Sequence, residues 1–148
     1  MTDPAAYFDS GQAVELSKYI ITKRHDMKKY INNLQLQLLL FCIQRSTLRV
    51  YGEVAFDDKI EAQRYSPRIW RPYYRWCHNA VMDILDTYPS DYEPKHKELV
   101  DGIIETTTDL KWIWADDLIS PRWSKIFQQL GNGTVITPRM IMNIDWGV

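Results

Sequence analysis

The sequence predicts a mainly α-helical fold, a compact bundle of five to six helices around one buried central helix, with a short β-hairpin between the second and third helices. Three observations lead to this prediction. The 148 residues suit a single domain, and they contain no linker or internal repeat. Apolar residues recur every three or four positions in most segments. Residues 34–43 are apolar on nearly all sides of a helix, as is typical of a core helix. We therefore expect one domain over residues 1–148, with residues 1–9 flexible or loosely docked.

The first two helices are expected over residues 10–23 and 30–50. Ser10 can cap the first helix, which has regularly spaced apolar residues on one face. In the second, leucines at alternate positions would also suit a strand. Its length and its lack of Gly and Pro favour a helix. Gly52 can then adopt the left-handed conformation that commonly ends a helix.

The next segment, residues 54–65, predicts the hairpin, with its turn at residues 57–59. Pro67 would end the hairpin, and Pro72 would lie in the first turn of a third helix over residues 73–87. The apolar stripe of that helix would comprise Tyr73, Trp76, Cys77, Ala80, Val81, Ile84 and Leu85.

The last third of the chain predicts further helices. One begins near Pro94 and should break at residues 106–109, where Thr and Asp are poor helix formers. A short helical piece is expected over residues 110–114. Ser-Pro at 120–121 and Thr-Pro at 137–138 each combine a cap with proline in the first turn, which predicts two more helix starts.

Composition excludes several classes of protein. With 45% apolar and 25% charged residues, the chain is neither a disordered tail nor a disulfide mini-protein. Its longest apolar run, residues 38–43, is far shorter than the ~20 residues that span a bilayer. The beginning of the chain has no secretory signal pattern, so we expect a cytoplasmic protein. Cys42 and Cys77 lie in apolar helical patterns and are expected to be buried thiols, although a bond between them stays open.

Motifs for catalysis, cofactors or metals are missing from the sequence. The three histidines are scattered without metal-ligand spacing, and no nucleotide-binding or nucleophile motif is present. The adjacent aspartates at 57–58 and 116–117 do not indicate a magnesium site. We therefore expect a protein that is not an enzyme and carries no cofactor, although residues from distant segments could still converge in a catalytic pocket.

The charges are polarised along the chain. Residues 18–75 hold twelve Lys and Arg against five Asp and Glu, a balance of +7. Residues 83–117 hold ten Asp and Glu against three Lys, a balance of −7. Either the two regions pack together with solvated charged faces, or the basic region meets an acidic partner.

Arginines and aromatic residues alternate within the basic region. Arg, Trp and Tyr are enriched at binding hot spots because they combine a large buried area with directional hydrogen bonds. Any helical stretch would align the arginines at 68, 71 and 75, while Tyr73 and Trp76 are interpreted as core residues. The predicted partner-binding residues are Arg64, Tyr65, Arg68, Trp70, Arg71 and Arg75.

The sequence also resembles the Panacea domain, a SocA-like, phage-associated family. The resemblance runs from about residue 11 to residue 144, through Asn-Leu-Gln-Leu-Gln-Leu-Leu-Leu-Phe at 33–41, Tyr-Gly-Glu at 51–53, Ile-Glu-Ala at 60–62, Tyr-Ser-Pro at 65–67 and Ser-Pro-Arg-Trp at 120–123. This chain departs from the family pattern at four positions, where the family has Lys, Trp, Gly and Val and this chain has Leu38, Gln63, Ser66 and Arg68. The departures in the Arg and aromatic loop put any inherited partner in doubt.

The resemblance implies a role without catalysis. Family members include antitoxins that neutralise a toxin by contact, an adaptor that hands a toxin to a protease, and phage or prophage proteins of unassigned role. Our leading hypothesis is an antitoxin-like or phage-encoded inhibitor or adaptor in a bacterial cell, which contacts a toxin or host protein through the Arg and aromatic loop. The alternative is nucleic-acid binding through residues 18–75, because aromatic stacking and Arg–phosphate contacts use the same residue types. A homodimer also stays open.

Overall fold

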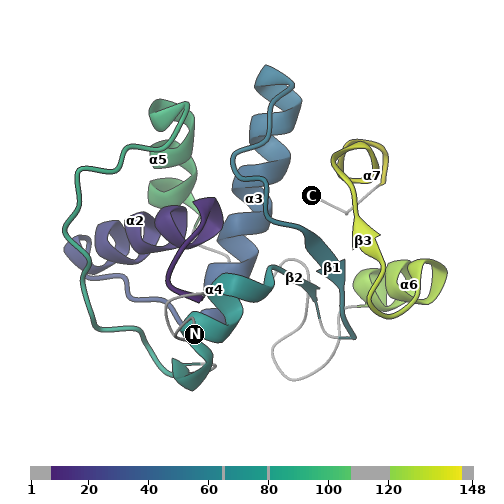
Figure 1. The fold of residues 1–148 in the computed structure, drawn as a ribbon, viewed down its shortest axis with the longest axis horizontal. Coiled ribbons are helices and arrows are strands. Elements are labelled where there is room, and N and C mark those ends of the chain that lie inside the picture. Colours follow the sequence, from purple (N-terminus) through teal and green to yellow (C-terminus); the bar gives the residue numbers. More distant parts are fainter. Residues whose placement is uncertain (1–7, 65, 80, 108–120, 145–148) are drawn as a thin grey trace, which may run out of the picture.

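The computed structural model describes residues 8–64, 66–79, 81–107 and 121–144. Within these ranges the chain is mainly helical, with one small antiparallel sheet, which confirms the predicted fold class (Figure 1). Its strands, in the spatial order β2-β1-β3, are β1 (Ile60–Ala62), β2 (Pro67–Arg68) and β3 (Val135–Ile136). The helices are α2 (Gln12–Asp26), α3 (Asn33–Tyr51), α4 (Trp70–Arg75), the 3-10 turn η1 (Cys77–Asn79), α5 (Lys97–Thr106), α6 (Pro121–Leu130) and α7 (Pro138–Asn143).

The central helix is α3, as predicted. It runs through the middle of the molecule, with α2 and α5 on one side and the sheet, α6 and α7 on the other (Figure 1). Asn32 caps its first turn by accepting from the Gln35 backbone N–H at 2.8 Å, and the Gln35 side chain accepts from the Asn32 N–H at 3.0 Å. Gly52 ends the helix at φ 68°, in the left-handed conformation that glycine adopts without strain.

Two buried glutamines of α3 fix the chain on either side of β1 and β2. The Gln37 amide donates to the Ile69 carbonyl at 3.3 Å and accepts from the Ile69 N–H at 2.8 Å. Gln44, two turns further on, donates to the Phe56 carbonyl at 2.9 Å and accepts from the Ala55 N–H at 2.7 Å. Buried backbone groups that would otherwise lack partners are satisfied in this way, and the sheet is held against the central helix.

The predicted hairpin exists, but its strands lie elsewhere. β1 pairs with β2 and not with residues 54–56, and Pro67 is part of β2 instead of ending the hairpin. Residues 57–59, expected to form the hairpin turn, contact the start of α2 instead. Asp58 accepts from the Ala13 N–H at 3.1 Å, and the Asp57 N–H donates to the Gln12 side chain at 2.8 Å. The first of these contacts satisfies a backbone N–H in the first turn of α2 from 45 positions away, and the second ties the Gln12 side chain to the same loop.

The boundaries of α2 differ from the prediction at both ends. Gly11, not Ser10, is the N-cap residue, and its side chain cannot supply a cap. The distant Asp58 carboxylate takes over that role, which no local pattern indicates. The helix continues to Asp26, past the polar residues that suggested an end at residue 23.

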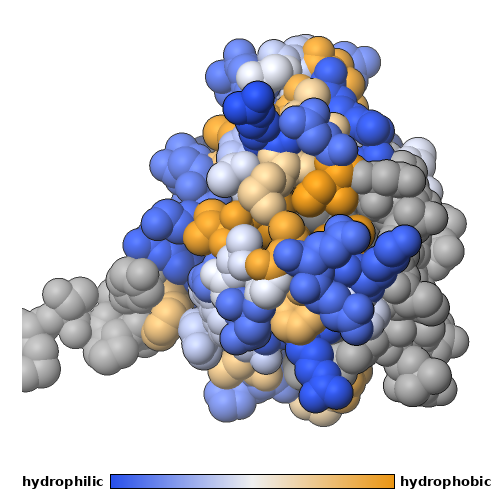
Figure 2. All heavy atoms as spheres, turned by 90° about the vertical axis from the view of Figure 1, so that its right-hand side faces the viewer, coloured by the Kyte–Doolittle hydropathy of each residue, from blue (hydrophilic) through white to orange (hydrophobic). Residues whose placement is uncertain are grey.

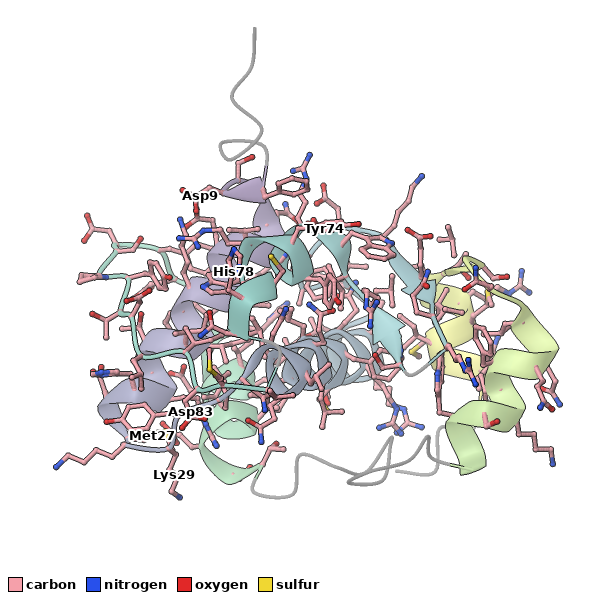
Figure 3. All side chains as sticks on the ribbon, turned by 90° about the horizontal axis from the view of Figure 1, so that it is seen from below. Asp9, Met27, Lys29, Tyr74, His78 and Asp83 are labelled. Atoms are coloured by element: carbon pink, nitrogen blue, oxygen red, sulfur yellow. The ribbon has the colours of Figure 1, made fainter. Side chains whose placement is uncertain are left out.

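The predicted long third helix is wrong. α4 ends at Arg75, η1 follows, and within the described part of residues 81–94 there is no helix or strand. Of the expected apolar stripe, Ile84 is 2% exposed, whereas Val81 and Leu85 are 78% and 64% exposed. The segment crosses the molecule as an extended strap because its backbone bonds elsewhere: Ile84 N–H donates to Ile31 and Tyr88 N–H to Thr22. Figure 3 accordingly shows Asp83 near Met27 and Lys29.

The C-terminal helices begin where the Ser-Pro and Thr-Pro signals predict. α6 begins at Pro121 and buries Trp123 and Ile126. Thr137 caps α7 by accepting from the Met140 N–H at 3.2 Å. The break predicted near residues 106–109 agrees with the end of α5 at Thr106. The piece predicted over residues 110–114, like the aspartates at 116–117, lies outside the described residues.

Some charges of the basic and acidic regions pair with each other inside the molecule, where α2 meets α5. Lys23 pairs with Glu105 at 3.0 Å and with Asp101 at 3.8 Å. Arg24, only 5% exposed, donates to the carbonyls of Lys29 and Ile104 at 2.9 and 3.1 Å. A cation at the C-terminal end of α5 also complements the helix dipole. For these residues the two charged regions pack against each other.

Two further sequence expectations concern the cysteines and the membrane. Cys42 and Cys77 are not joined in a disulfide, and Cys42 is half-buried against the core. Cys77 is exposed, so the prediction that it is buried is wrong, because α4 ends before reaching it. In the parts of the chain that the structure describes, no helix is both long and apolar enough to cross a membrane.

Candidate functional site

The predicted binding residues lie on β2, on α4 and in the turn between β1 and β2. The Gln63 N–H closes that turn on the Ser66 carbonyl at 3.2 Å, and Arg64 is exposed there. Tyr65 lies outside the described residues. Because Arg68 belongs to β2, the expected alignment of three arginines on one helix is wrong. Only Arg71 and Arg75 share a helix, one turn apart on α4.

Arg68 is held by aromatic rings. Its guanidinium carbon lies 4.1 Å from the centroid of the Tyr73 ring and 5.4 Å from that of Trp70, within the range of cation–π attraction. The Nε atom is buried without a hydrogen-bond partner. Glu61 is its neighbour across the sheet, but no ion pair forms between them. Among the described residues no carboxylate pairs with Arg68, so its terminal nitrogens remain available for an anionic group.

The aromatic rings of α4 form a connected set. Trp70 stacks on Tyr74 with centroids 5.2 Å apart and planes at 20°, and Tyr73 meets Trp70 edge to face at 5.6 Å. Tyr74 is 46% exposed, which is high for a large aromatic side chain. Such a set supplies wide apolar contact area in a fixed geometry, beside a planar cation that can bind a carboxylate through two hydrogen bonds.

Arg75 is engaged within the molecule. Its Nε donates to the Asp9 carboxylate at 2.9 Å, and its guanidinium lies 5.0 Å from the centroid of the Trp76 ring and 5.5 Å from that of Tyr88. Burial, the largest single influence, lowers the pKa of Arg75, but the hydrogen bond and charge of Asp9 together with the interaction with Tyr88 outweigh it, and the net shift is upward. The same hydrogen bond is the main reason why the pKa of Asp9 is lowered. Trp76 itself is buried, in agreement with its interpretation as a core residue.

The residues before α2 lie against α4. The Phe8 ring packs on Tyr74 with centroids 5.0 Å apart, and the Ser10 carbonyl accepts from Arg71 at 3.4 Å. Figure 3 shows Asp9 and Tyr74 on the same edge of the molecule. Sequence reasoning missed this contact and the part played by Tyr74, since nothing local connects residues more than 60 positions apart.

Two hollows flank this region. One, of about 440 Å³, lies beside Trp70 and Arg71 and is walled by the charged residues Asp57, Asp58, Lys59 and Glu61. The other, of about 280 Å³, is mainly apolar and lies between α3, the sheet and α7, with Val54, Phe56 and Val135 in its lining. Figure 2 shows the apolar residues that gather on this face between charged neighbours. The sequence patterns did not indicate either hollow.

Metal chemistry finds no support in the part of the chain that is described. No group of three or more His, Cys, Asp or Glu there is arranged to hold a metal ion. His96, at the start of α5, contacts Glu53 at 2.9 Å and stacks on Tyr51, and Lys95 pairs with the same carboxylate. These contacts join the end of α3 to the start of α5.

We compared the chain with protein-family models, with curated proteins and with solved structures, and found no match in any of the three. The resemblance to the Panacea domain therefore stays a prediction.

Proposed function

We propose that this chain is a protein-binding module without catalytic activity. Its binding site would be the α4 surface, defined here as Arg64, Arg68, Trp70, Arg71, Tyr74 and Arg75. The observation that carries the proposal is the Arg68 guanidinium, which lies against two aromatic rings and forms no ion pair with a carboxylate among the described residues. A carboxylate of a partner would bind the terminal nitrogens of this guanidinium.

Protein binding fits this surface better than nucleic-acid binding does. Several charges of the basic region are neutralised inside the molecule: Lys23 pairs with α5 and Lys18 and Arg75 pair with Asp9. Trp70 and Tyr74 also stack on each other, so less ring surface is offered to a base. An acidic and partly apolar protein surface would complement the exposed Arg and aromatic groups.

The resemblance to the Panacea domain supports a more specific role. On this proposal the chain is antitoxin-like, or a phage-encoded inhibitor or adaptor, and acts in a bacterial cell by contact with a toxin or host protein. The proposed mechanism is direct occupation of the target by the α4 surface, with no reaction step.

Affinity capture with matched variants tests the proposed site. The chain and its Arg68→Gln variant are used as bait in lysate from the cells that encode the protein. We expect one protein to be captured, with roughly tenfold weaker binding for Arg68→Gln, as is usual for a hot-spot arginine. Arg68→Lys keeps the charge but loses the planar fork, so it should recover only part of the binding.

Arg139→Gln is the matched control. Arg139 is exposed on α7, on the far side of the sheet from α4, and the substitution removes the same charge (Figure 1). Equal capture by Arg68→Gln and Arg139→Gln would contradict the proposal. Recovery of DNA or RNA, with binding that weakens steeply as salt rises, would support the nucleic-acid alternative instead.

A further inference from the structure

Part of the α4 surface already has an occupant, which is the chain's own segment of residues 8–10. Phe8 packs on the exposed Tyr74 ring with centroids 5.0 Å apart. Asp9 accepts a hydrogen bond from Arg75 at 2.9 Å, and the Ser10 carbonyl accepts from Arg71 at 3.4 Å. An aromatic ring, a carboxylate and a backbone carbonyl of this segment thus contact Tyr74, Arg75 and Arg71 of the α4 surface.

The chemistry of this contact is that of a bound peptide. The aromatic ring packs on the ring set of α4, and the carboxylate accepts a charge-assisted hydrogen bond from Nε of Arg75. The Arg75 guanidinium also lies over the Trp76 and Tyr88 rings, which hold it in place to receive the carboxylate. This half of the surface is therefore preorganised for an aromatic residue followed by an acidic one.

The segment is held by contacts that can be exchanged. The side chains of Asp9 and Arg75 are 46% and 31% exposed, and ion pairs at such positions contribute little to stability because water screens them. Lys18 also pairs with Asp9, at 3.0 Å, so the carboxylate keeps one cation when Arg75 is released. A partner with the same two groups and further contacts to Arg68 and Trp70 would compete effectively.

We propose that the α4 surface recognises a protein segment in which an aromatic residue is followed by a carboxylate, and that residues 8–10 compete with it from within the chain. This inference rests on the proposed function, because it names the chemistry of the partner at the same surface. The internal segment lowers the apparent affinity for the partner, since a tethered competitor is present at a high effective concentration.

A labelled synthetic peptide with the sequence of residues 5–11 tests the inference in the full chain. Its binding is followed by fluorescence anisotropy for the unaltered chain and for a Phe8→Ala, Asp9→Asn double variant. We expect the double variant to bind the peptide roughly fivefold more tightly, because its own segment no longer competes. Asp86→Asn, which removes one exposed charge from the strap, is the control and should bind like the unaltered chain.

Two further measurements fix the site. A peptide carrying Asp9→Asn should bind the double variant several-fold more weakly, and adding Arg75→Gln to the double variant should weaken the original peptide equally. Equal peptide binding by the unaltered chain and the double variant, or binding that does not depend on Arg75, overturns the inference. A dimer that disappears in the double variant also overturns it, since the segment would then belong to a second copy.

Failure of this inference can be told apart from failure of the proposed function. If capture of a partner depends on Arg68 while the peptide does not bind, the α4 surface stands as the binding site and only the aromatic–acidic chemistry is wrong. If capture is independent of Arg68, the proposed function is wrong whatever the peptide does.

Discussion

Three arginines of this protein lie in three different environments. Arg24 is buried, and backbone carbonyls accept its hydrogen bonds. Arg75 is paired with Asp9. Arg68 is stacked on two rings and has no carboxylate partner within the described ranges. The first environment stabilises the fold, the second is an exposed ion pair that contributes little to stability, and the third leaves a strong hydrogen-bonding group without a carboxylate.

A second feature at the residue scale is the hydrogen bond from the Tyr19 hydroxyl to Asp101, which joins α2 to α5. Burial, and then this hydrogen bond, raise the pKa of Tyr19 to about 12. The neutral phenol is therefore favoured in the folded state relative to the unfolded chain, where its pKa is about 10. Its contribution to stability is full below pH 10 and is lost as the pH rises towards 12.

Urea unfolding at several pH values between 8 and 12 checks this prediction. We expect the stability of the unaltered chain to fall more steeply above pH 10 than that of Tyr19→Phe, which cannot lose the phenolic proton. Lys23 and Lys97 both pair with Asp101, and the substitution leaves these two lysines in place. Parallel curves would show that Tyr19 is not linked to folding.

At the scale of elements, two glycines, Gly52 and Gly102, should respond oppositely to alanine. Gly52 ends α3 at φ 68°, where a side chain is strained although there is space for it. Gly102 lies inside α5 with ordinary helical geometry and open space around a Cβ. We expect Gly52→Ala to lower the free energy of unfolding by about 1 kcal/mol. Gly102→Ala should raise it by about 0.5–1 kcal/mol, because the unfolded chain loses freedom.

Thermal and urea unfolding of the two variants, measured side by side, gives the signs directly. Because neither alanine meets an atom within 4 Å, backbone conformation alone separates them. Changes of the same sign would contradict the assigned end of α3 or the helical geometry of α5.

The sequence predicted the elements whose signals are local. Gly52 ends α3, and Thr137 with Pro138 begins α7, because caps and prolines act within one turn, whereas the Asn32 cap that begins α3 three residues after the expected start was missed. It mispredicted the elements whose partners are distant. Asp58 was interpreted as part of a hairpin turn, but it caps α2 instead.

Contacts between residues distant in the sequence also explain why the extended strap of residues 81–87 and part of the site were not predicted. Residues 81–87 have a helical apolar pattern, but contacts with Ile31 and Thr22 hold the backbone extended beside α2. At the site, the sequence pattern selects Arg68, Trp70, Arg71 and Arg75, which lie on β2 and α4. It could not show that Arg75 is paired with Asp9, since that pairing spans 66 positions.

At the scale of the whole molecule, the fold divides its charged groups into those that hold it together and those that remain for binding. The α2 and α5 interface uses Lys23 and Arg24 against acidic groups and carbonyls of the other half of the chain. The near-neutral total charge is therefore the sum of charges that partly cancel in space. The α4 surface itself carries a small group of arginines and rings.

The central claim is that the α4 surface contacts a protein, and a photo-crosslinker at Tyr74 tests it most directly. Tyr74 is 46% exposed, and Met142 on α7, 42% exposed, is a control position of matched accessibility. In the cells that encode the chain, we expect irradiation to give one protein adduct from the Tyr74 position, lost when Arg68→Gln is added, and none from the Met142 position. Equal adducts from both positions, no adduct at all, or an adduct with nucleic acid would contradict the claim.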